Sequence, residues 1–113
     1  MVAIERFTQL SAPRQALVRL FQFVNFGQIL GITIQNGDPV FHPEPTVLVD
    51  VKLDSNECER PEVDLPDFAL CDKVRRLMAL LDELQNGRIE RIVVLSGIPR
   101  RAIIERHLTE TSR

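Results

Sequence analysis

The sequence predicts an α+β fold in which two tandem helix–β-hairpin units form one mostly antiparallel sheet with both helices on one face. Two stretches, 11–26 and about 68–86, carry apolar residues at the three- and four-residue steps of an amphipathic helix. Each stretch is followed by a run rich in β-branched residues, a glycine turn and a second run, which is the pattern of a β-hairpin. A helix with a single hairpin cannot cover its own apolar faces, so we expect the two units to pack together.

The first unit spans about residues 11–53 and begins with a helix. Ser11 is the predicted N-cap, and Pro13 falls in the first turn, where its missing N–H is tolerated. Gly27 is expected to end the helix, because glycine enters the left-handed conformation at little cost. The predicted apolar stripe consists of Leu17, Leu20, Phe21 and Val24.

The hairpin of the first unit is predicted to turn at Asn36-Gly37, since Asn-Gly between two apolar runs is a strong hairpin signal. The return strand is expected to pause at residues 42–45 and to resume over residues 46–53. Alternation in the resumed part predicts one buried face and one wet face. The residues assigned to the buried face are Val47, Val49, Val51 and Leu53.

The second unit, about residues 67–108, repeats this plan. Asp67 is its predicted N-cap, Gly87 ends the helix, and Ser96-Gly97 forms the turn. Residues 18–39 superpose on residues 78–99 without a gap, which predicts an internal duplication. An acidic connector, residues 54–66, joins the units, and we expect residues 1–113 to form a single domain. The second apolar stripe consists of Leu70, Val74, Leu77, Met78, Leu81 and Leu84.

One irregularity occurs in both units. Ile29 is out of phase with the two apolar residues that follow it, and Ile89 shows the same shift. A one-residue β-bulge near Gly31 and Arg91 would place all the apolar residues on the core side. Alternatively, Ile29 and Ile89 lie in the turn that leaves each helix.

The stretch NFGQILGITIQNG, residues 25–37, resembles the segment [FY]-G-x-I-x-I-x-[VI]-x-x-G that follows a helix in the YezD-like family of very small bacterial proteins. The second copy has Asn86 in place of the aromatic residue. The resemblance implies a bacterial protein with a tandem version of the family's unit, and it supplies no active-site residue. The residues that carry it are Asn25, Phe26, Gly27, Ile29, Ile32, Ile34 and Gly37, with Gly87, Ile89, Ile92, Val94 and Gly97 in the second copy.

Composition and charge indicate an ordinary globular protein. The net charge of -2 offers no general attraction to nucleic acid or to an anionic membrane. No apolar run approaches the roughly 18 residues that span a bilayer, and Glu5 and Arg6 interrupt the N-terminal apolar stretch, so a cytoplasmic protein without membrane contact is expected. Charge is uneven, since residues 50–72 hold eight acidic and two basic residues and residues 73–113 hold nine basic and five acidic ones.

Motifs for catalysis are scarce. The five glycines form no phosphate-binding loop, and the two cysteines and two histidines lack the spacing of metal ligands. Cys71 is expected to be buried or inert, because Asp67 and Asp72 oppose the effect of the helix N-terminus on its thiol. We therefore expect no enzyme activity, no cofactor and no metal site.

Protein interaction is the leading expectation for function. The first helix is apolar beyond its stripe at Val18, Phe23 and Phe26, and a helix apolar nearly all round is buried on more than one side. This predicts self-association, as a homodimer, through that face or through a sheet edge, with another protein partner as a variant of the same reading. Alternatively, residues 1–10 fold back over the helix, with VAIERF as an added edge strand.

Binding to a nucleic-acid backbone is the second expectation for function. Five arginines cluster around the second hairpin and could contact phosphates from a two-stranded ribbon. The chain has no tryptophan or tyrosine, and its phenylalanines fall mostly in apolar segments, so base stacking is not expected. The candidate contacts are Arg88, Arg91, Arg100, Arg101 and Arg106.

Overall fold

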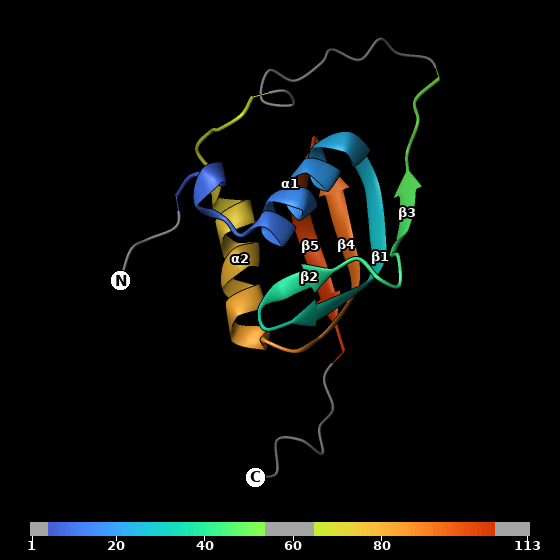
Figure 1. Ribbon diagram of the computed structural model, residues 1–113. Coiled ribbons are helices and arrows are strands. Elements are labelled where there is room, and N and C mark those ends of the chain that lie inside the picture. The colour runs from blue at the N-terminus through green and yellow to red at the C-terminus, as the bar shows by residue number, and fades with distance from the viewer. Residues whose placement is uncertain (1–4, 54–64, 106–113) are drawn as a thin grey trace.

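The computed structural model of the protein describes residues 5–53 and 65–105, which build one layer of helices on one antiparallel sheet (Figure 1). This confirms the predicted α+β class. The elements are the 3-10 turn η1 (Phe7–Gln9), the helices α1 (Ala12–Val24) and α2 (Asp72–Leu84), and the strands β1 (Phe26–Gln35), β2 (Asp38–Val40), β3 (Thr46–Val49), β4 (Gly87–Leu95) and β5 (Ile98–Ile104).

The sheet has β1 and β4 at its centre. β4 pairs with β1 on one side and with β5 on the other, and every pairing is antiparallel. On its other side β1 pairs first with β3 and then with β2, which are two parts of one return strand. The predicted pause at residues 42–45 is therefore confirmed, and β2, β3 and β5 form the edges of the sheet.

Both helices pack on the same face of the sheet (Figure 1), and the core lies between them and the central strands. The predicted stripes supply the helical side of this core, with Leu17, Phe21 and Leu81 fully buried. Burial of each such side chain contributes about 1.5–3 kcal/mol. The strands contribute six residues with at most 1% exposure: Ile29, Ile32, Ile34, Ile89, Ile92 and Val94.

The buried positions on the strands follow the predicted break in alternation. Two residues separate Ile29 from Ile32, and two separate Ile89 from Ile92, yet all four side chains face the core. The register of β4 against β5 shifts between Ile89 and Arg91, and Gly31 has a φ of 77°. The β1–β4 register is not shifted, because both strands carry the extra residue at facing positions.

The prediction for the start of the second helix was wrong. α2 begins at Asp72 with Cys71 as N-cap, and Cys71 is exposed rather than buried. Asp67 instead accepts hydrogen bonds from Arg6 Nε at 2.7 Å and from the Thr8 backbone N–H at 3.0 Å. A contact with a segment about 60 residues away thus replaces the local capping role that the sequence suggests.

The prediction that Gly27 and Gly87 end the helices in the left-handed conformation was also wrong. The left-handed residues at the helix ends are Asn25 (φ 62°) and Gln85 (φ 58°). Gly27 is required for a different reason, since a Cβ atom there would lie 1.9 Å from the carbonyl oxygen of Leu48. The close approach of β3 to β1 depends on this glycine.

The return strand is shorter and less buried than predicted. It ends at Val49, and the residues assigned to its buried face are exposed from that point on: Val49 by 46%, Val51 by 66% and Leu53 by 94%. Val47 alone of that set packs against the core. The reason is that the chain leaves the sheet beyond Val49, where the helical layer no longer covers it.

The described part of the N-terminal segment folds back over the helices, which is the alternative that we gave to self-association through the first helix. Phe7 and Leu10 are buried in the core, and the Phe7 ring stacks on Phe68 with 4.9 Å between ring centroids. Over its described part, from residue 5, this segment forms η1 and a single bridge between Arg6 and Ala69 rather than an edge strand.

The helix starts and the hairpin turns of the two halves lie 60 residues apart in the sequence. α1 begins at Ala12 and α2 at Asp72, and both hairpins turn with positive φ at two residues. These are Asn36-Gly37 (54° and 80°) and Ser96-Gly97 (55° and 72°), as type I′ turns require. A common origin of the two units remains a prediction.

Each helix has 13 residues. Among the described residues, no helix combines the length and the hydropathy that crossing a bilayer requires.

Candidate functional site

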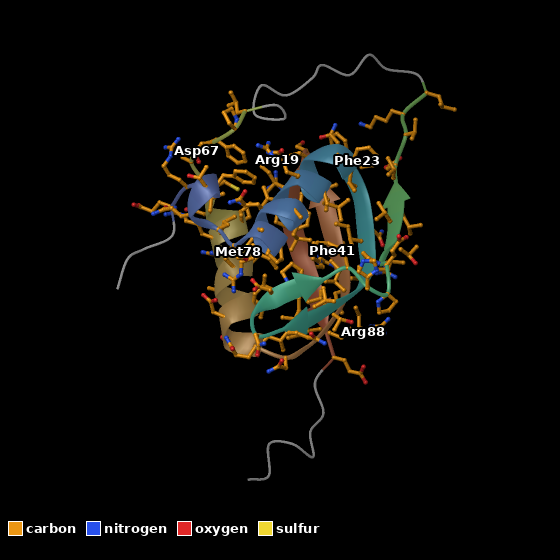
Figure 2. The ribbon with its side chains drawn as sticks, in the orientation of Figure 1. Arg19, Phe23, Phe41, Asp67, Met78 and Arg88 are labelled. Carbon is orange, nitrogen blue, oxygen red and sulfur yellow. The ribbon has the colours of Figure 1, made fainter. Side chains whose placement is uncertain are left out.

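The three residues predicted to form one interaction face lie in three different surroundings. Val18 is 3% exposed and belongs to the core, because the fold itself covers that side of α1. Phe23 is 75% exposed near the end of α1 (Figure 2). Phe26 lies opposite Leu95 on the uncovered face of the sheet, with Lys52 Nζ 5.4 Å from its ring centroid. The predicted face is therefore wrong as a single surface.

The predicted arginines are likewise divided between two sides of the fold. Arg91 and Arg101 are exposed and extend from the uncovered face, opposite Leu30 and Val93 in the register. Arg88 also lies on that face, where its guanidinium is 2.8 Å from Glu90. A Cβ atom on Gly31 would meet Arg88 at 2.9 Å, so this side chain lies over the β1 backbone.

Arg100 belongs to a groove between α2 and the β5 edge. The groove has a volume of about 340 Å³ and a floor formed by Leu77, Leu80, Pro99 and Ala102. Lys73 and Arg76 from α2 and Arg100 from β5 surround it, and Arg101, whose side chain extends from the uncovered face, borders it. None of the described residues that line it is acidic. Within the part of the chain that the structure describes, none of these four cations forms an ion pair. We call it the basic groove. Arg106 lies outside the described residues.

The β3 edge presents an uncharged strand to solvent. Its sequence is TVLV, and β1 is its one neighbour among the described strands. The Asp50 N–H donates to the Phe26 carbonyl at 2.7 Å, so Leu48, two residues before it, also points its backbone groups at β1. The backbone groups of Val47 and Val49 therefore point away from the sheet and are open to a further strand.

An apolar hollow extends from this edge across the uncovered face. Its volume is about 330 Å³, and its lining includes Leu48 and Val49 of β3 with Val93 and Leu95 of β4. Leu48 and Leu95 are both nearly half exposed. Exposed apolar side chains of this size, on the two strands that flank β1, are typical of a surface that contacts another protein.

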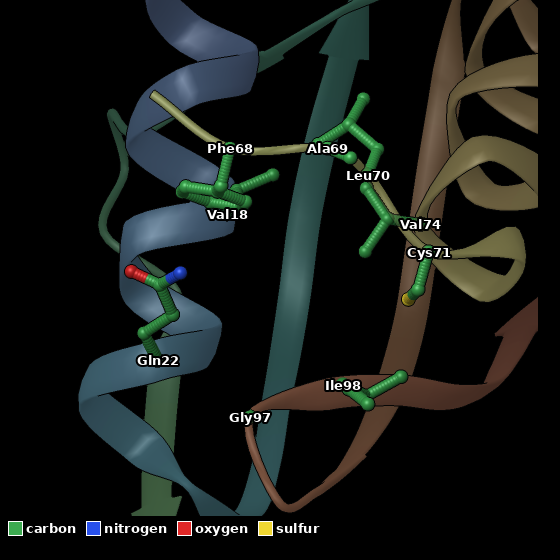
Figure 3. Close-up of a pocket in the computed structure, with 9 residues that line it drawn as sticks. All are labelled: Val18, Gln22, Phe68, Ala69, Leu70, Cys71, Val74, Gly97 and Ile98. Atoms are coloured by element: carbon green, nitrogen blue, oxygen red, sulfur yellow. The ribbon is translucent and has the colours of Figure 1, made fainter. Parts of the chain in front are cut away.

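A third hollow lies between the two helices, beside the hairpin turn of β4 and β5 (Figure 3). It has a volume of about 230 Å³ and lies among Val18 and Gln22 of α1, residues 68–71, Val74 of α2 and the turn at Gly97. Figure 3 shows the sulfur of Cys71 directed into it. We call it the interhelical pocket.

The sequence reasoning missed several of these features. Lys73 and Arg76 were not included with the arginines, although their three-residue spacing places them on one side of a helix. The interhelical pocket was missed because its walls come from four separate segments, which only the fold brings together. Among the described residues, no group of three histidine, cysteine or acidic side chains is placed to hold a metal ion.

No protein-family model, curated protein or solved structure matches the chain. The resemblance of residues 25–37 to the YezD-like family therefore remains a prediction.

Proposed function

We propose that the protein is a small, non-enzymatic interaction module that pairs with a second copy of itself along β3. The observation that carries this proposal is the uncovered β3 edge, with its outward backbone groups at Val47 and Val49 and its apolar side chains. A strand edge of this kind is a template for pairing with another strand. The bacterial origin and cytoplasmic location expected from the sequence belong to the same proposal.

The two edges of the sheet differ in how they are protected. β5 carries Pro99 and two arginines, and its register against β4 shifts twice. Proline, charge and irregular register are the devices by which natural sheets prevent edge pairing. The four residues of β3 have none of them. This contrast favours β3 over β5 as the pairing edge.

The apolar surroundings of β3 would add to the contact. Leu48 and Val49 line the hollow on the uncovered face, and Phe23 projects from the end of α1 on the same side of the fold as β1 and β3 (Figure 2). A four-residue edge is short beside interfaces that bury about 1,200–2,000 Å², so we expect a dissociation constant of about micromolar.

Sedimentation velocity and native mass spectrometry over a concentration series test the proposal. We expect a reversible dimer of about twice 12.9 kDa for the native protein. Val49→Lys should be monomeric, because it places a charge at the centre of the interface. Ile103→Lys is the matched control, since Ile103 on β5 is 44% exposed and Val49 is 46% exposed.

A second variant at the same position tests whether the dimer depends on the backbone hydrogen bonds of β3 rather than on the apolar side chain of Val49. Val49→Pro removes one outward N–H and leaves the β1–β3 hydrogen bonds, so the fold should persist while dimerisation weakens. A native protein that stays monomeric at high concentration contradicts the proposal. Dimerisation that Val49→Lys and Ile103→Lys weaken equally would assign it to another surface.

The second candidate function is contact with a nucleic-acid backbone, and the basic groove is the observation that favours it. Four cations without carboxylate partners could bind phosphates, with affinity falling steeply as salt rises. Anisotropy of a labelled duplex between low and physiological salt measures this directly. Arg76→Glu with Arg100→Glu should abolish the binding, whereas Arg88→Glu should not, because Arg88 is already bonded to Glu90. Absence of salt-dependent binding by the native protein would eliminate this function.

A further inference from the structure

The interhelical pocket lies at the second hairpin turn, and the first hairpin turn has an equivalent position whose residues are offset by 60 in the sequence. Comparing the two positions shows which side chain is missing from the pocket. In one place the Gly37 N–H donates to the carbonyl of Gln85 at the end of α2, over 2.8 Å. In the other the Gly97 N–H donates to the carbonyl of Asn25 at the end of α1, also over 2.8 Å. Each hairpin turn is therefore held against the end of the other unit's helix in the same way.

At the first place, Arg14 fills the space between the turn and the helices. Its guanidinium donates from Nε and Nη2 to the Gly37 carbonyl, at 3.1 and 2.8 Å. It also lies 2.6 Å from Asp82 and 3.6 Å from Asp38. Ser11 donates to Asp38 at 2.7 Å and accepts the Arg14 N–H. A side chain that donates hydrogen bonds to Gly37 and to Asp82 thus occupies this position.

At the second place, Val74 stands 60 residues from Arg14 in the sequence and has no side-chain donor. The positions of Asp82, Asp38 and Ser11 are taken by Gln22, Ile98 and Cys71 respectively, all of which line the interhelical pocket. The space that a guanidinium fills in one half of the fold is therefore an open pocket in the other (Figure 3).

The residues that stand at the positions of Arg14, Asp82, Asp38 and Ser11 also determine which ligands the pocket can bind. None of the described residues that line it is acidic, so these residues would supply no counter-charge to a buried cation. Its wall is mostly apolar, from Val18, Phe68, Leu70, Val74 and Ile98. Gly97 has nearly the same φ as Gly37 and makes the same N–H bond, so its carbonyl is the counterpart of the Gly37 carbonyl that Arg14 binds. A ligand would therefore meet an acceptor at Gly97, and the amide of Gln22 is a second polar group at the pocket.

We propose that the interhelical pocket binds a neutral small molecule that has one aromatic ring and a hydrogen-bond donor. The ring would pack against the apolar wall, and the donor would bond to the Gly97 carbonyl. An apolar cavity of about 150 Å³ is large enough for benzene, and this pocket has about 230 Å³. The site is independent of the β3 edge and of the basic groove.

Benzamide and benzamidinium form a matched pair of probes, because they have nearly the same shape and differ in charge. We expect benzamide, titrated to millimolar concentration into isotope-labelled protein, to shift the NMR signals of Cys71, Val74 and Ile98. Benzamidinium should bind at least about tenfold more weakly, since its charge would be desolvated without a partner. Equal binding of the two probes, or shifts confined to other residues, would overturn the proposal.

Two variants rebuild the counterpart in the pocket. Val74→Arg places a guanidinium beside the Gly97 carbonyl, as Arg14 lies beside Gly37, and should weaken benzamide binding at least about tenfold by occupying the pocket. Ile98→Asp should reverse the selectivity in favour of benzamidinium, because it supplies the carboxylate that Asp38 supplies to Arg14. If Val74→Arg is folded and binds benzamide as the native protein does, the ligand is not in this pocket.

Alkylation of Cys71 reports on benzamide binding without any substitution in the residues that line the pocket. In a Cys58→Ser background Cys71 is the single thiol of the chain, and it is exposed. Bound benzamide should slow alkylation of Cys71 by iodoacetamide several-fold, as followed by mass spectrometry. An alkylation rate unchanged at saturating benzamide would contradict the proposal even if Val74→Arg failed to fold.

Discussion

The guanidinium of Arg14, in the first turn of α1, lies 2.6 Å from the carboxylate of Asp82 in the last turns of α2. The same guanidinium donates twice to the Gly37 carbonyl in the first hairpin turn. One buried side chain therefore links both helices to a hairpin. Asp82 and the nearby Asp38 also compensate the placement of a cation near a helix N-terminus, which is unfavourable by itself.

Arg14→Met should destabilise the fold far more than Asp82→Asn. The methionine keeps much of the side-chain volume but leaves the Gly37 carbonyl without its donor, at a cost of about 2–3 kcal/mol. Asp82 has a side chain 68% exposed, so its loss should cost about 0–1 kcal/mol. Urea unfolding of the native protein and of the two variants gives both changes in the free energy of unfolding. Equal costs would mean that the Asp82 ion pair, and not the bond to Gly37, dominates.

Gly27→Ala and Gly87→Ala test equivalent positions with opposite expectations. The new Cβ of Gly27→Ala would lie 1.9 Å from the Leu48 carbonyl oxygen, which is backbone, so β3 must move away at a cost of about 1–3 kcal/mol or more. At Gly87 the nearest atom is Leu84 Cδ1 at 3.1 Å, on a flexible side chain, so the change should stay within about 1 kcal/mol. Thermal unfolding with circular dichroism measures both. Similar losses for both variants would contradict this reading.

Asp67 should make stability depend on pH in the acid range. The hydrogen bond from Arg6, and then that from the Thr8 N–H, lower the pKa of Asp67 from 3.8 to about 2. Because the folded pKa is depressed, the stabilisation is complete above about pH 4 and is lost as pH falls toward 2. Asp67→Asn should be less stable at neutral pH and should converge with the native protein near pH 2. Melting temperatures of both proteins between about pH 2 and pH 7 test this prediction. If the difference in melting temperature between them does not change with pH, Asp67 is not the source of the pH dependence.

Phe7→Ala should show that the N-terminal segment belongs to the core. Phe7 is 4% exposed, stacks on Phe68 and has the Arg19 guanidinium 4.3 Å from its ring centroid. Its truncation should cost about 3–5 kcal/mol. Phe23→Ala is the matched control, because Phe23 is 75% exposed and its truncation should change stability by about 0.5 kcal/mol or less. Both are best measured at a concentration where any dimer is dissociated.

The correct expectations came from interactions between residues close in sequence. The type I′ turn at Asn36-Gly37 follows from the two residues that form it. The apolar stripes follow from helical spacing, and the buried Ile29 and Ile89 follow from a shift in strand alternation. Each of these patterns is complete within a few residues, so no knowledge of the rest of the chain is needed.

The errors occurred where a distant segment replaces a local partner. Asp67 was expected to cap a helix, but Arg6 and Thr8 bind it. Val18 was expected to be open to a partner, but it is buried in the core. Val49 and Val51 were assigned to a buried face, but the helical layer does not extend over them. Spacing within a segment cannot reveal which of these neighbours is present.

The sequence by itself thus determined the class of fold, the positions of the turns and most of the core, because hydrophobic periodicity and turn chemistry act locally. The tertiary structure alone decided which surfaces remain open, namely the β3 edge, the basic groove and the interhelical pocket. Each of these surfaces joins residues from separate elements, and its character depends on what the other half of the chain covers. The exchange of Arg14 for Val74 is visible in the sequence, but only packing turns that exchange into a pocket.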